Sequence, residues 1–275
     1  NATKNQHKKI IARGGINTKS VELAYQLGFY GVALYGNLWK STNPFEKFMD
    51  FTNFCKEKNI PLVNANYPND GGIRGSPTVF IANPKINSHI QVIFNQIEKK
   101  WHESNIIWCR RLNSYDEKVE GIFKELNGAP NNGKIKYKTL TLNYIFNGLD
   151  ISASIDSTKN NVLIAGSLDE DFAKKFVSAV SSIERKNNIQ VIGMPSWENF
   201  KEIQHKNYAE IPIFYPSAFY IPIGNKWATT FDNRFRNVLG VKSSATAYKA
   251  FELTYYFAKL LIKYGKITVF NLDNP

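Results

Sequence analysis

Residues 161–172 read NVLIAGSLDEDF, and this stretch decides the fold. A short apolar run ends at Gly166-Ser167, and acidic residues at 169–171 then open an amphipathic segment that extends to about residue 185. This pattern predicts a buried strand, a tight turn and a helix with acids in its first turn. Because the same unit recurs before and after this stretch, we expect an α/β protein whose parallel sheets are covered by helices on both faces.

Apolar runs separated by turn residues predict the other elements of the chain. The segment 212–221 is expected to be extended. The loop 65–77 is long, and loops of this length are often functional. The expected strands are residues 8–12, 31–35, 60–64, 78–82, 105–109, 134–142 and 189–193, and the expected helices are residues 17–27, 44–58, 84–101, 115–126, 149–158, 227–239 and 245–264.

Composition narrows the class of protein. With 275 residues, 43% of them hydrophobic, the chain is long enough for one large domain or two lobes. No apolar run approaches the roughly 20 residues of a membrane span, so we expect no membrane insertion. Residues 1–9 are polar without an apolar segment after them, which predicts no signal peptide. The net charge is +12, but the lysines are scattered and no nucleic-acid motif accompanies them, so we expect no nucleic-acid partner.

The search for catalytic and cofactor motifs is largely negative. The four histidines have no metal-ligand spacing, and neither a phosphate-binding loop nor a nucleophile elbow occurs. A glycine-rich run at 71–75 follows a loop instead of joining a strand to a helix, so it is a weak nucleotide signal. Cys109 lies in an apolar run and is expected to be buried, and no spacing supports a disulfide with Cys55. The sequence therefore contains no catalytic motif that we recognise, and we expect no cofactor or metal site.

Polar and aromatic residues gather where the predicted strands end, and ligands of open parallel sheets bind beyond these carboxyl ends. The set suits a zwitterion, because arginine, serine or a helix start holds a carboxylate while an acid or an aromatic face holds an ammonium. The alternative is that these are turn and capping residues, with Asp169 favoured by the helix dipole alone. The candidate ligand-binding residues are Asn64, Asp70, Asp169 and Ser196, together with Tyr67, Arg74, Arg110 and Ser167 for polar contacts and Trp197 and Tyr220 for stacking.

Four segments carry a resemblance to a known family. They read KNIPLVNANYPNDGG at 58–72, GSLDEDF at 166–172, IGMPSWENF at 192–200 and AYKAFELTYYF at 247–257. From about residue 50 onward the chain resembles the type 1 periplasmic-binding-protein-like family, and in particular its Bacteroidetes branch of amino-acid ABC-transporter substrate-binding proteins. The resemblance implies two Rossmann-like lobes, each with a parallel sheet flanked by helices, that close on a ligand between them without catalysis.

The resemblance also implies boundaries and partners. The N-terminal lobe is expected to comprise residues 1–104 with about 226–265, and the C-terminal lobe residues 105–225 with about 266–275. The implied ligand is small and polar, an amino acid or a peptide-like molecule. The implied partner is an ABC transporter or a cell-envelope component, and the implied location is the periplasm or cell envelope. The ligand-contacting segment of the family maps onto residues 64–70, which lack its usual Ser/Thr-rich pattern.

Residues 8–50 resemble a second family. IIARGGI at 10–16 and GFYGVALYGNLW at 28–39 look like the last two βα units of thiamine phosphate synthase, whose glycines hold a phosphate. The chain lacks the preceding barrel strands and the acidic metal-binding residues of that family, so we interpret this segment as a strand, a helix and a strand of the N-terminal lobe. Two alternatives stay open: a phosphate-handling α/β enzyme built around Gly14-Gly15 and Gly36, and a ligand-free interaction or cell-envelope module.

Overall fold

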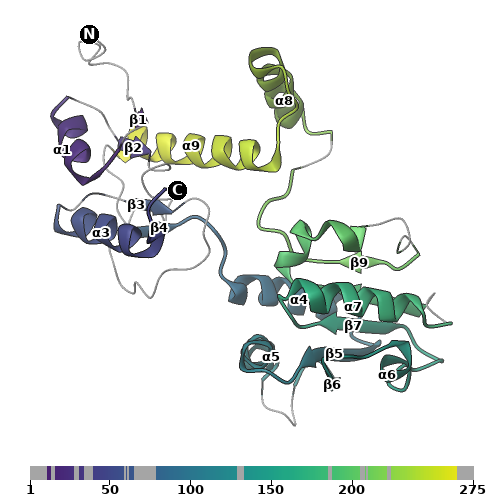
Figure 1. Cartoon of the computed structure of the whole chain (residues 1–275). Helices are drawn as coiled ribbons and strands as arrows, with labels where there is room; N and C mark the ends of the chain where they lie inside the picture. Colours follow the sequence, from purple (N-terminus) through teal and green to yellow (C-terminus); the bar gives the residue numbers. More distant parts are fainter. Residues whose placement is uncertain are drawn as a thin grey trace. The chain divides into compact units, whose positions relative to one another are not determined.

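A computed structural model of the protein describes residues 11–13, 16–27, 31–33, 40–58, 60, 62–64, 79–128, 133–184, 188–204, 208, 210–221 and 224–264. The chain divides into two compact units. Unit 1 comprises Asn1–Ala82 and Lys249–Pro275, and unit 2 comprises Asn83–Tyr248. Figure 1 labels the helices and strands of both units.

Unit 2 is built around a five-stranded parallel sheet. Its strand order is β6-β5-β7-β8-β9, so the first strand of the unit lies between the second and the third. In β5, Cys109 pairs with Leu140 of β6 on one side and with Ala165 of β7 on the other. This arrangement confirms the α/β class with parallel sheets that the alternating pattern predicts. The strands are β5 (Asn105–Arg111), β6 (Tyr137–Leu142), β7 (Asn161–Ala165), β8 (Ile189–Ile192) and β9 (Ile213–Phe214).

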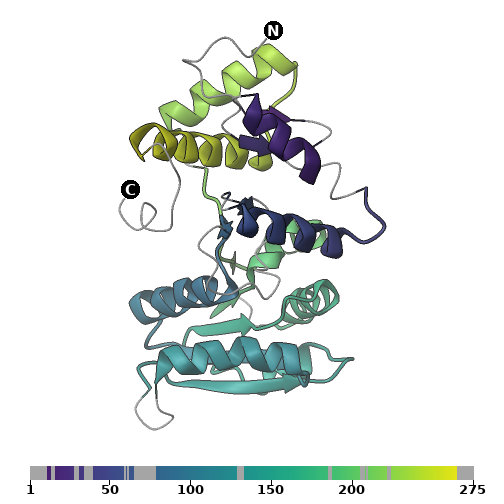
Figure 2. The same cartoon turned by 90° about the vertical axis from the view of Figure 1, so that its left-hand side faces the viewer.

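Helices cover both faces of this sheet (Figures 1 and 2). The chain crosses the sheet in one direction from β5 to β6 and in the opposite direction from β6 to β7 and β8. Because crossovers between parallel strands are right-handed, α5 lies on one face and α6 and α7 lie on the other. The contacts agree, since α4 packs against α5 and α6 packs against α7. The helices of unit 2 are α4 (Ile86–Lys100), α5 (Ser114–Asn127), α6 (Gly148–Ser152), α7 (Glu170–Ser181), α8 (Lys226–Leu239) and the 3-10 helices η3 (Pro195–Asn199) and η4 (Lys201–Gln204).

The core of unit 2 lies between the sheet and its helices. Every residue of β7 is buried, as its unbroken apolar run predicts. Trp108 of β5 is fully buried and packs on the backbone of Gly166, where an added Cβ atom would lie 2.3 Å from the indole Nε1. The ring of Phe123, also fully buried, lies 5.0 Å from that of Trp108. Glycine at position 166 is therefore required by the packing of the core.

Side-chain caps fix where α5 and α7 begin. Asn113 accepts hydrogen bonds from the backbone N–H groups of Tyr115 (3.0 Å) and Asp116 (2.8 Å) at the start of α5. Asp169 accepts a hydrogen bond from the N–H of Phe172 (2.7 Å) at the start of α7. Each cap closely follows a strand. The caps therefore set how the chain turns from the carboxyl ends of β5 and β7 into the next helix.

Unit 1 contains two pairs of short parallel strands. β1 (Ile11–Arg13) pairs with β2 (Gly31–Ala33), and β3 (Leu62–Asn64) pairs with β4 (Val79–Ile81). Small apolar clusters accompany them, one around Phe51 and another that joins Phe80 to Leu260. The helices are α1 (Thr18–Gln26), α3 (Pro44–Glu57) and α9 (Ala245–Tyr264), of which α9 begins in unit 2.

Two predicted elements of unit 2 have half their expected length or less in the structure. The helix expected at 149–158 ends at Ser152, because the side chain of Asn161 holds the following residues in a loop by donating to the carbonyls of Asp156 (2.9 Å) and Lys159 (3.0 Å). The extended segment 212–221 contributes only the two residues of β9 to the sheet. Proline at 216 has no N–H to donate, which agrees with the early end of that strand.

Helix α4 belongs to unit 2, where Ile90, Phe94 and Ile97 are part of the buried core. The sequence expectation assigns this helix to the N-terminal lobe, and the complete division into lobes stays a prediction. Both cysteines are free and buried, Cys55 in unit 1 and Cys109 in unit 2. Across the described ranges, no helix combines the length and the apolarity needed to cross a membrane.

Candidate functional site

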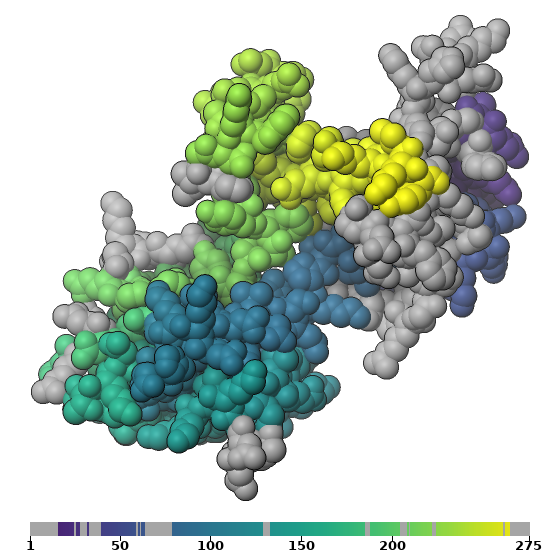
Figure 3. Space-filling model, turned by 180° about the vertical axis from the view of Figure 1, so that it is seen from behind, coloured from purple at the N-terminus to yellow at the C-terminus, as the bar shows by residue number. Residues whose placement is uncertain are grey.

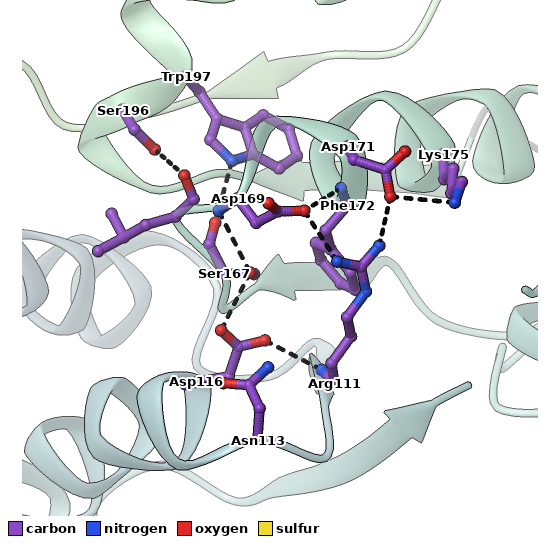
Figure 4. Close-up of polar contacts among 11 residues, drawn as sticks. Arg111, Asn113, Asp116, Ser167, Asp169, Asp171, Phe172, Lys175, Ser196 and Trp197 are labelled. Atoms are coloured by element: carbon purple, nitrogen blue, oxygen red, sulfur yellow. Dashed lines mark hydrogen bonds and ion pairs between the residues drawn. The ribbon is translucent and has the colours of Figure 1, made fainter. Parts of the chain in front are cut away.

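The strand order of unit 2 creates a switch point between β5 and β7. The chain leaves β5 toward α5 on one face and leaves β7 toward α7 on the other, so the two turns separate. In doubly wound sheets, ligands bind in the crevice that results at the carboxyl ends of these strands. Figure 4 shows the polar side chains that meet there. We call this set the switch-point cluster: Arg111, Asn113, Asp116, Ser167, Asp169 and Asp171.

Arg111, the last residue of β5, joins the two turns (Figure 4). Its guanidinium donates from Nη1 to Asp169 Oδ1 (2.8 Å) and from Nη2 to Asp171 Oδ2 (2.7 Å). The guanidinium carbon also lies 4.7 Å from the ring centre of Tyr144, a cation–π contact. Only 14% of the Arg111 side chain is exposed, whereas those of Asp169 and Asp171 are 52% and 48% exposed. The two carboxylates therefore hold the arginine in place and still face the solvent.

The first turn of α7 carries charges that these cations stabilise. Hydrogen bonds from Lys175 and then from Arg111 hold the pKa of the Asp171 carboxyl below its usual value. Lys175 Nζ lies 3.0 Å from Asp171 Oδ2 and also 4.3 Å from the ring centre of Tyr144. Negative charge at a helix N-terminus is favourable, so the arrangement is stable without a ligand.

A buried hydrogen-bonded pair lies beside these ion pairs. Ser167 is 1% exposed and donates from Oγ to Asp116 Oδ1 (3.0 Å). The other oxygen of Asp116, which is 4% exposed, accepts the backbone N–H of Arg111 (3.1 Å). Ser167 Oγ accepts the backbone N–H of Asp169 (3.3 Å). The pair therefore locks the turn after β7 to the start of α5, and a direct ligand contact of Ser167 stays a prediction.

Two predicted residues after β8 brace the same turn from η3. Trp197 is fully buried and donates from Nε1 to the carbonyl of Ser167 (3.3 Å). Ser196 donates from Oγ to the carbonyl of Leu168 (3.1 Å). Both side chains thus hold the backbone of the turn (Figure 4). A stacking contact between Trp197 and a ligand stays a prediction that requires the indole to become accessible.

Arg110 takes part in a different network, on α5. Its Nε donates to Glu120 Oε2 (2.7 Å), and the 1% exposed side chain of Glu120 also accepts from Thr139 Oγ1 (2.6 Å) and Lys124 Nζ (3.0 Å). Burial acts to raise the pKa of Glu120, but the hydrogen bonds from Thr139, Lys124 and Arg110 outweigh it and lower the pKa below the usual value. A ligand carboxylate would therefore compete with Glu120 for Arg110.

The remaining predicted residues are Tyr220 in unit 2, Asn64 in unit 1 and three residues that the structure does not describe. Tyr220 follows β9 in unit 2 and is 78% exposed. Asn64 is the last residue of β3 in unit 1. Tyr67, Asp70 and Arg74 lie outside the described residues. Ligand contacts by these five residues stay predictions.

Sequence reasoning missed four members of the cluster: Arg111, Asn113, Asp116 and Asp171. It selected Arg110 from an adjacent arginine pair, and spacing alone does not tell which of the two faces the turn after β7. A signal for Asp116 is present in the sequence. Asn113 caps a helix directly after a strand and so places residue 116 in the first helical turn, which is the position of the acids in the next strand-helix unit.

The cluster offers acidic groups to a ligand, and exposed apolar and aromatic side chains lie near it. Arg111 of the cluster and its neighbour in sequence, Arg110, are both already paired with carboxylates. Nearby residues that follow β5 and β6 expose large apolar surfaces, with Leu112 76%, Tyr115 69% and Tyr144 67% exposed. In the part of the chain that the structure describes, no group of His, Cys, Asp and Glu residues is arranged to hold a metal ion.

The chain is similar in fold to solved bacterial transport proteins. An ABC transporter substrate-binding protein from Desulfitobacterium hafniense matches with a TM-score of 0.60 and 14% identity, over 92% of this chain and 84% of that chain. The chain shares the fold of ABC transporter substrate-binding proteins. The expected type 1 periplasmic-binding-protein-like fold is therefore confirmed.

Two further matches are complexes with amino acids. A structure of an ABC transporter substrate-binding protein from Desulfitobacterium hafniense in complex with Leu has a TM-score of 0.55 and 12% identity, over 93% of this chain and 84% of that chain. The branched-chain amino acid transporter substrate-binding protein LivJ from Streptococcus pneumoniae, in complex with isoleucine, has a TM-score of 0.50 and 15% identity, over 89% of this chain and 67% of that chain. No family model matches the chain, and no curated protein matches its sequence.

Proposed function

We propose that the chain is a non-catalytic solute-binding protein that holds a small polar ligand, an amino acid or a peptide-like molecule. We assign its binding site to the switch-point cluster of unit 2, at the carboxyl ends of β5 and β7. The observation that carries this proposal is the position of the cluster, since it lies at the topological switch point, where doubly wound folds bind ligands. The solved complexes of the same fold contain Leu and isoleucine, which supports an amino-acid ligand.

The cluster is suited to the ammonium group of such a ligand. Asp169 Oδ1 is used by Phe172 N–H and Arg111, but the carboxylate is half exposed and has a second oxygen. Tyr115 lies in the first turn of α5 with its ring largely exposed, so it offers an aromatic face to a cation. Because Arg110 and Arg111 are both paired, we propose that the carboxylate of the ligand is held by groups other than these arginines.

The first test measures ligand-dependent stability of the whole chain. Thermal unfolding is followed with leucine, isoleucine, glutamate, short neutral peptides and phosphorylated metabolites. A ligand at 100 times its dissociation constant should add about 2.7 kcal/mol to the unfolding free energy, which is a clear shift in melting temperature. We expect the shift with neutral amino acids or neutral peptides, and calorimetry then gives the dissociation constant.

A pair of isosteric variants tests the role of Asp169. Asp169→Asn keeps the helix cap, because Asn and Asp cap equally well, but it removes the charge that faces the ammonium. Asp171→Asn is the matched control, since it removes the other carboxylate paired with Arg111. We expect Asp169→Asn to weaken binding at least about ten-fold, the effect of losing a hydrogen bond between charged groups, and Asp171→Asn to weaken it less. Equal effects of the two variants would contradict the assignment.

The finer placement of the chain is also a proposal. The segments at 58–72, 166–172, 192–200 and 247–257 place it in the Bacteroidetes amino-acid branch of this fold. A partner that is an ABC transporter or a cell-envelope component, and a location in the periplasm or cell envelope, follow from that placement. The fold neighbours are named as transporter components, which supports this view.

The likeness of residues 8–50 to thiamine phosphate synthase leaves an enzyme as the alternative. β1, α1 and β2 form the expected strand, helix and strand with parallel pairing, which both families share. Gly14, Gly15 and Gly36 lie outside the described residues. A melting shift confined to phosphorylated metabolites and lost in Gly15→Asp would favour the enzyme. No shift with any compound of the panel would favour the ligand-free interaction or cell-envelope module.

A further inference from the structure

Helix α8 of unit 2 is strongly amphipathic and lies at the surface (Figure 3, light green). None of its 14 residues, all of which the structure describes, is buried. At 3.6 residues per turn, the apolar residues of the helix fall within an arc of about 120°, and its polar residues occupy the rest of the circumference. The apolar residues are Trp227, Ala228, Phe231, Phe235, Val238 and Leu239.

Only part of this apolar arc is used inside unit 2. The ring of Phe231 lies 4.7 Å from that of Tyr248, and the Tyr248 hydroxyl donates to the carbonyl of Ala228 (3.0 Å). Phe235 is half-buried, and its ring lies 5.7 Å from that of Phe231. Within unit 2 the other large apolar residues of the arc, with the next valine in the chain, are exposed. A contiguous exposed apolar strip of this kind marks an interaction surface. The exposed fractions are 81% for Trp227, 80% for Val238, 58% for Leu239 and 58% for Val241.

The helix is held in shape by its own caps and by the loop that follows it. Asn225 accepts the backbone N–H of Trp227 (2.8 Å) at the first turn, and Gly240, with a φ of 72°, ends the helix in the left-handed conformation. Asp232 accepts the backbone N–H of Ser243 (2.9 Å) and pairs with Arg236 (2.9 Å). The exposed strip is therefore presented on a preformed helix, and binding does not require this helix to fold first.

The surface around the strip is positively charged. Residues 224–244 contain four basic residues, Lys226, Arg234, Arg236 and Lys242, and one acidic residue, Asp232, which gives a net charge of +3. Asp232 is itself paired with Arg236. Arg234 lies on one side of the apolar arc, next to Trp227 on the helix circumference, and is exposed. The arc is therefore bordered by Arg234 on one side and by the paired Asp232 and Arg236 on the other, and Lys226 lies on the polar face of the helix.

We propose that α8 binds the surface of an anionic lipid bilayer, with Trp227 and Val238 among the headgroups and the basic residues on the lipid phosphates. A helix with one apolar face that includes Trp, Phe and Leu, basic residues on its polar face and low overall hydrophobicity has the physical character of an interfacial helix. This contact lies on the membrane surface and does not span it. It is independent of the proposed solute site.

The charge and the chemistry of the strip favour lipid over other partners. A second copy of the chain docked through the same face would place one +3 surface against another, which is unfavourable. Nucleic acids bind through base stacking on aromatic rings, yet Val238, Leu239 and Val241 have no ring to stack. An anionic bilayer offers apolar contact to the aliphatic side chains and negative charge to the cations.

The test is co-sedimentation of the full chain with phosphatidylcholine vesicles that contain or lack phosphatidylglycerol. We expect binding to the phosphatidylglycerol vesicles that weakens as salt is raised, and much weaker binding to phosphatidylcholine alone. Trp227→Ser with Val238→Ser should weaken binding at least about ten-fold by removing apolar contact. Arg234→Gln should weaken it about five-fold at low salt by removing one cation from the surface.

Matched controls separate the helix from the rest of the protein. Leu149→Ser removes from helix α6 of unit 2 a side chain as exposed as that of Val238, and Lys118→Gln removes an exposed cation from α5. Both should bind vesicles like the wild type. All substituted side chains are exposed, so melting temperatures should be unchanged. The proposal is overturned by no binding to phosphatidylglycerol vesicles at low salt, by equal losses in the controls, or by a loss that tracks dimer dissociation or RNA binding instead of lipid.

Discussion

Arg110→Ala and Arg111→Ala, measured separately, compare two losses of stability: one in which a buried carboxylate loses its arginine and one in which exposed carboxylates do. The side chains of Arg110 and Arg111 are similarly covered, with 12% and 14% exposed. Arg110 pairs with Glu120, whose side chain is 1% exposed, whereas Arg111 pairs with Asp169 and Asp171, whose side chains are about half exposed. A carboxylate that loses its partner in the interior is not rehydrated, but one at the surface is. We expect Arg110→Ala to cost more stability than Arg111→Ala.

The contacts of Glu120 give the size of the effect. Breaking a buried ion pair by removing one partner costs about 3–5 kcal/mol. Glu120 keeps two other donors, Thr139 Oγ1 at 2.6 Å and Lys124 Nζ at 3.0 Å, so the loss in unfolding free energy should be about 2–3 kcal/mol. With a urea dependence of about 1–3 kcal/mol per M, the unfolding midpoint should fall by roughly 1 M. A compensating variant, Arg110→Met with Glu120→Leu, should recover part of this loss because no charge is left buried.

The assay is urea unfolding followed by the fluorescence of the buried Trp108 and Trp197, which report on unit 2. The pH dependence gives a second readout. The pKa of Glu120 is lowered in the folded state, so its stabilisation is present above the usual value of 4.5 and is lost as the pH falls through the lowered value. The difference between wild type and Arg110→Ala should therefore shrink in acid. A midpoint for Arg111→Ala equal to or below that of Arg110→Ala would refute this reasoning.

Three further predictions concern packing, protonation and a buried amide. Gly166→Ala should lower the unfolding free energy by about 1–3 kcal/mol, because the added Cβ would lie 2.3 Å from Nε1 of the buried Trp108. The control is Gly121→Ala in α5, whose Cβ meets nothing within 4 Å and which should not destabilise the protein. Burial lowers the pKa of His89, and the charge of the nearby Glu198 partly offsets this effect. The unfolding free energy should therefore fall as the pH drops below 6.5, the usual pKa of histidine. The melting temperature of His89→Gln should change less with pH. Asn161→Ala removes a fully buried side chain that makes four hydrogen bonds. The unfolding free energy measured with urea should fall by at least about 2 kcal/mol. A smaller loss would show that water replaces those bonds.

Local signals in the sequence predicted much of what forms the candidate site. The run at 162–165 indicated a buried strand, and Asp169 was expected in the first turn of the next helix, which it caps. The turn at Gly166-Ser167 follows the carboxyl end of β7, as the strand-end search predicted. The choice between neighbouring side chains was not available from the sequence. Arg110 and Arg111 differ by one position in a strand, so they point to opposite sides, and pattern alone does not tell which side meets α7.

The sequence by itself determined which segments of this protein become strands and helices, since apolar period, caps and turn residues act over a few neighbouring residues. It also indicated parallel sheets, because strands and helices alternate. Only the tertiary structure decided the order of the strands, and with it the meeting of Arg111 with the acids that follow β7. These partners are 58 and 60 residues apart in the chain, and such a contact depends on how β5 and β7 pair within the sheet. Tertiary packing also decided that Ser167 and Trp197 are buried supports of the turn, because burial is a property of the whole core and not of any local stretch.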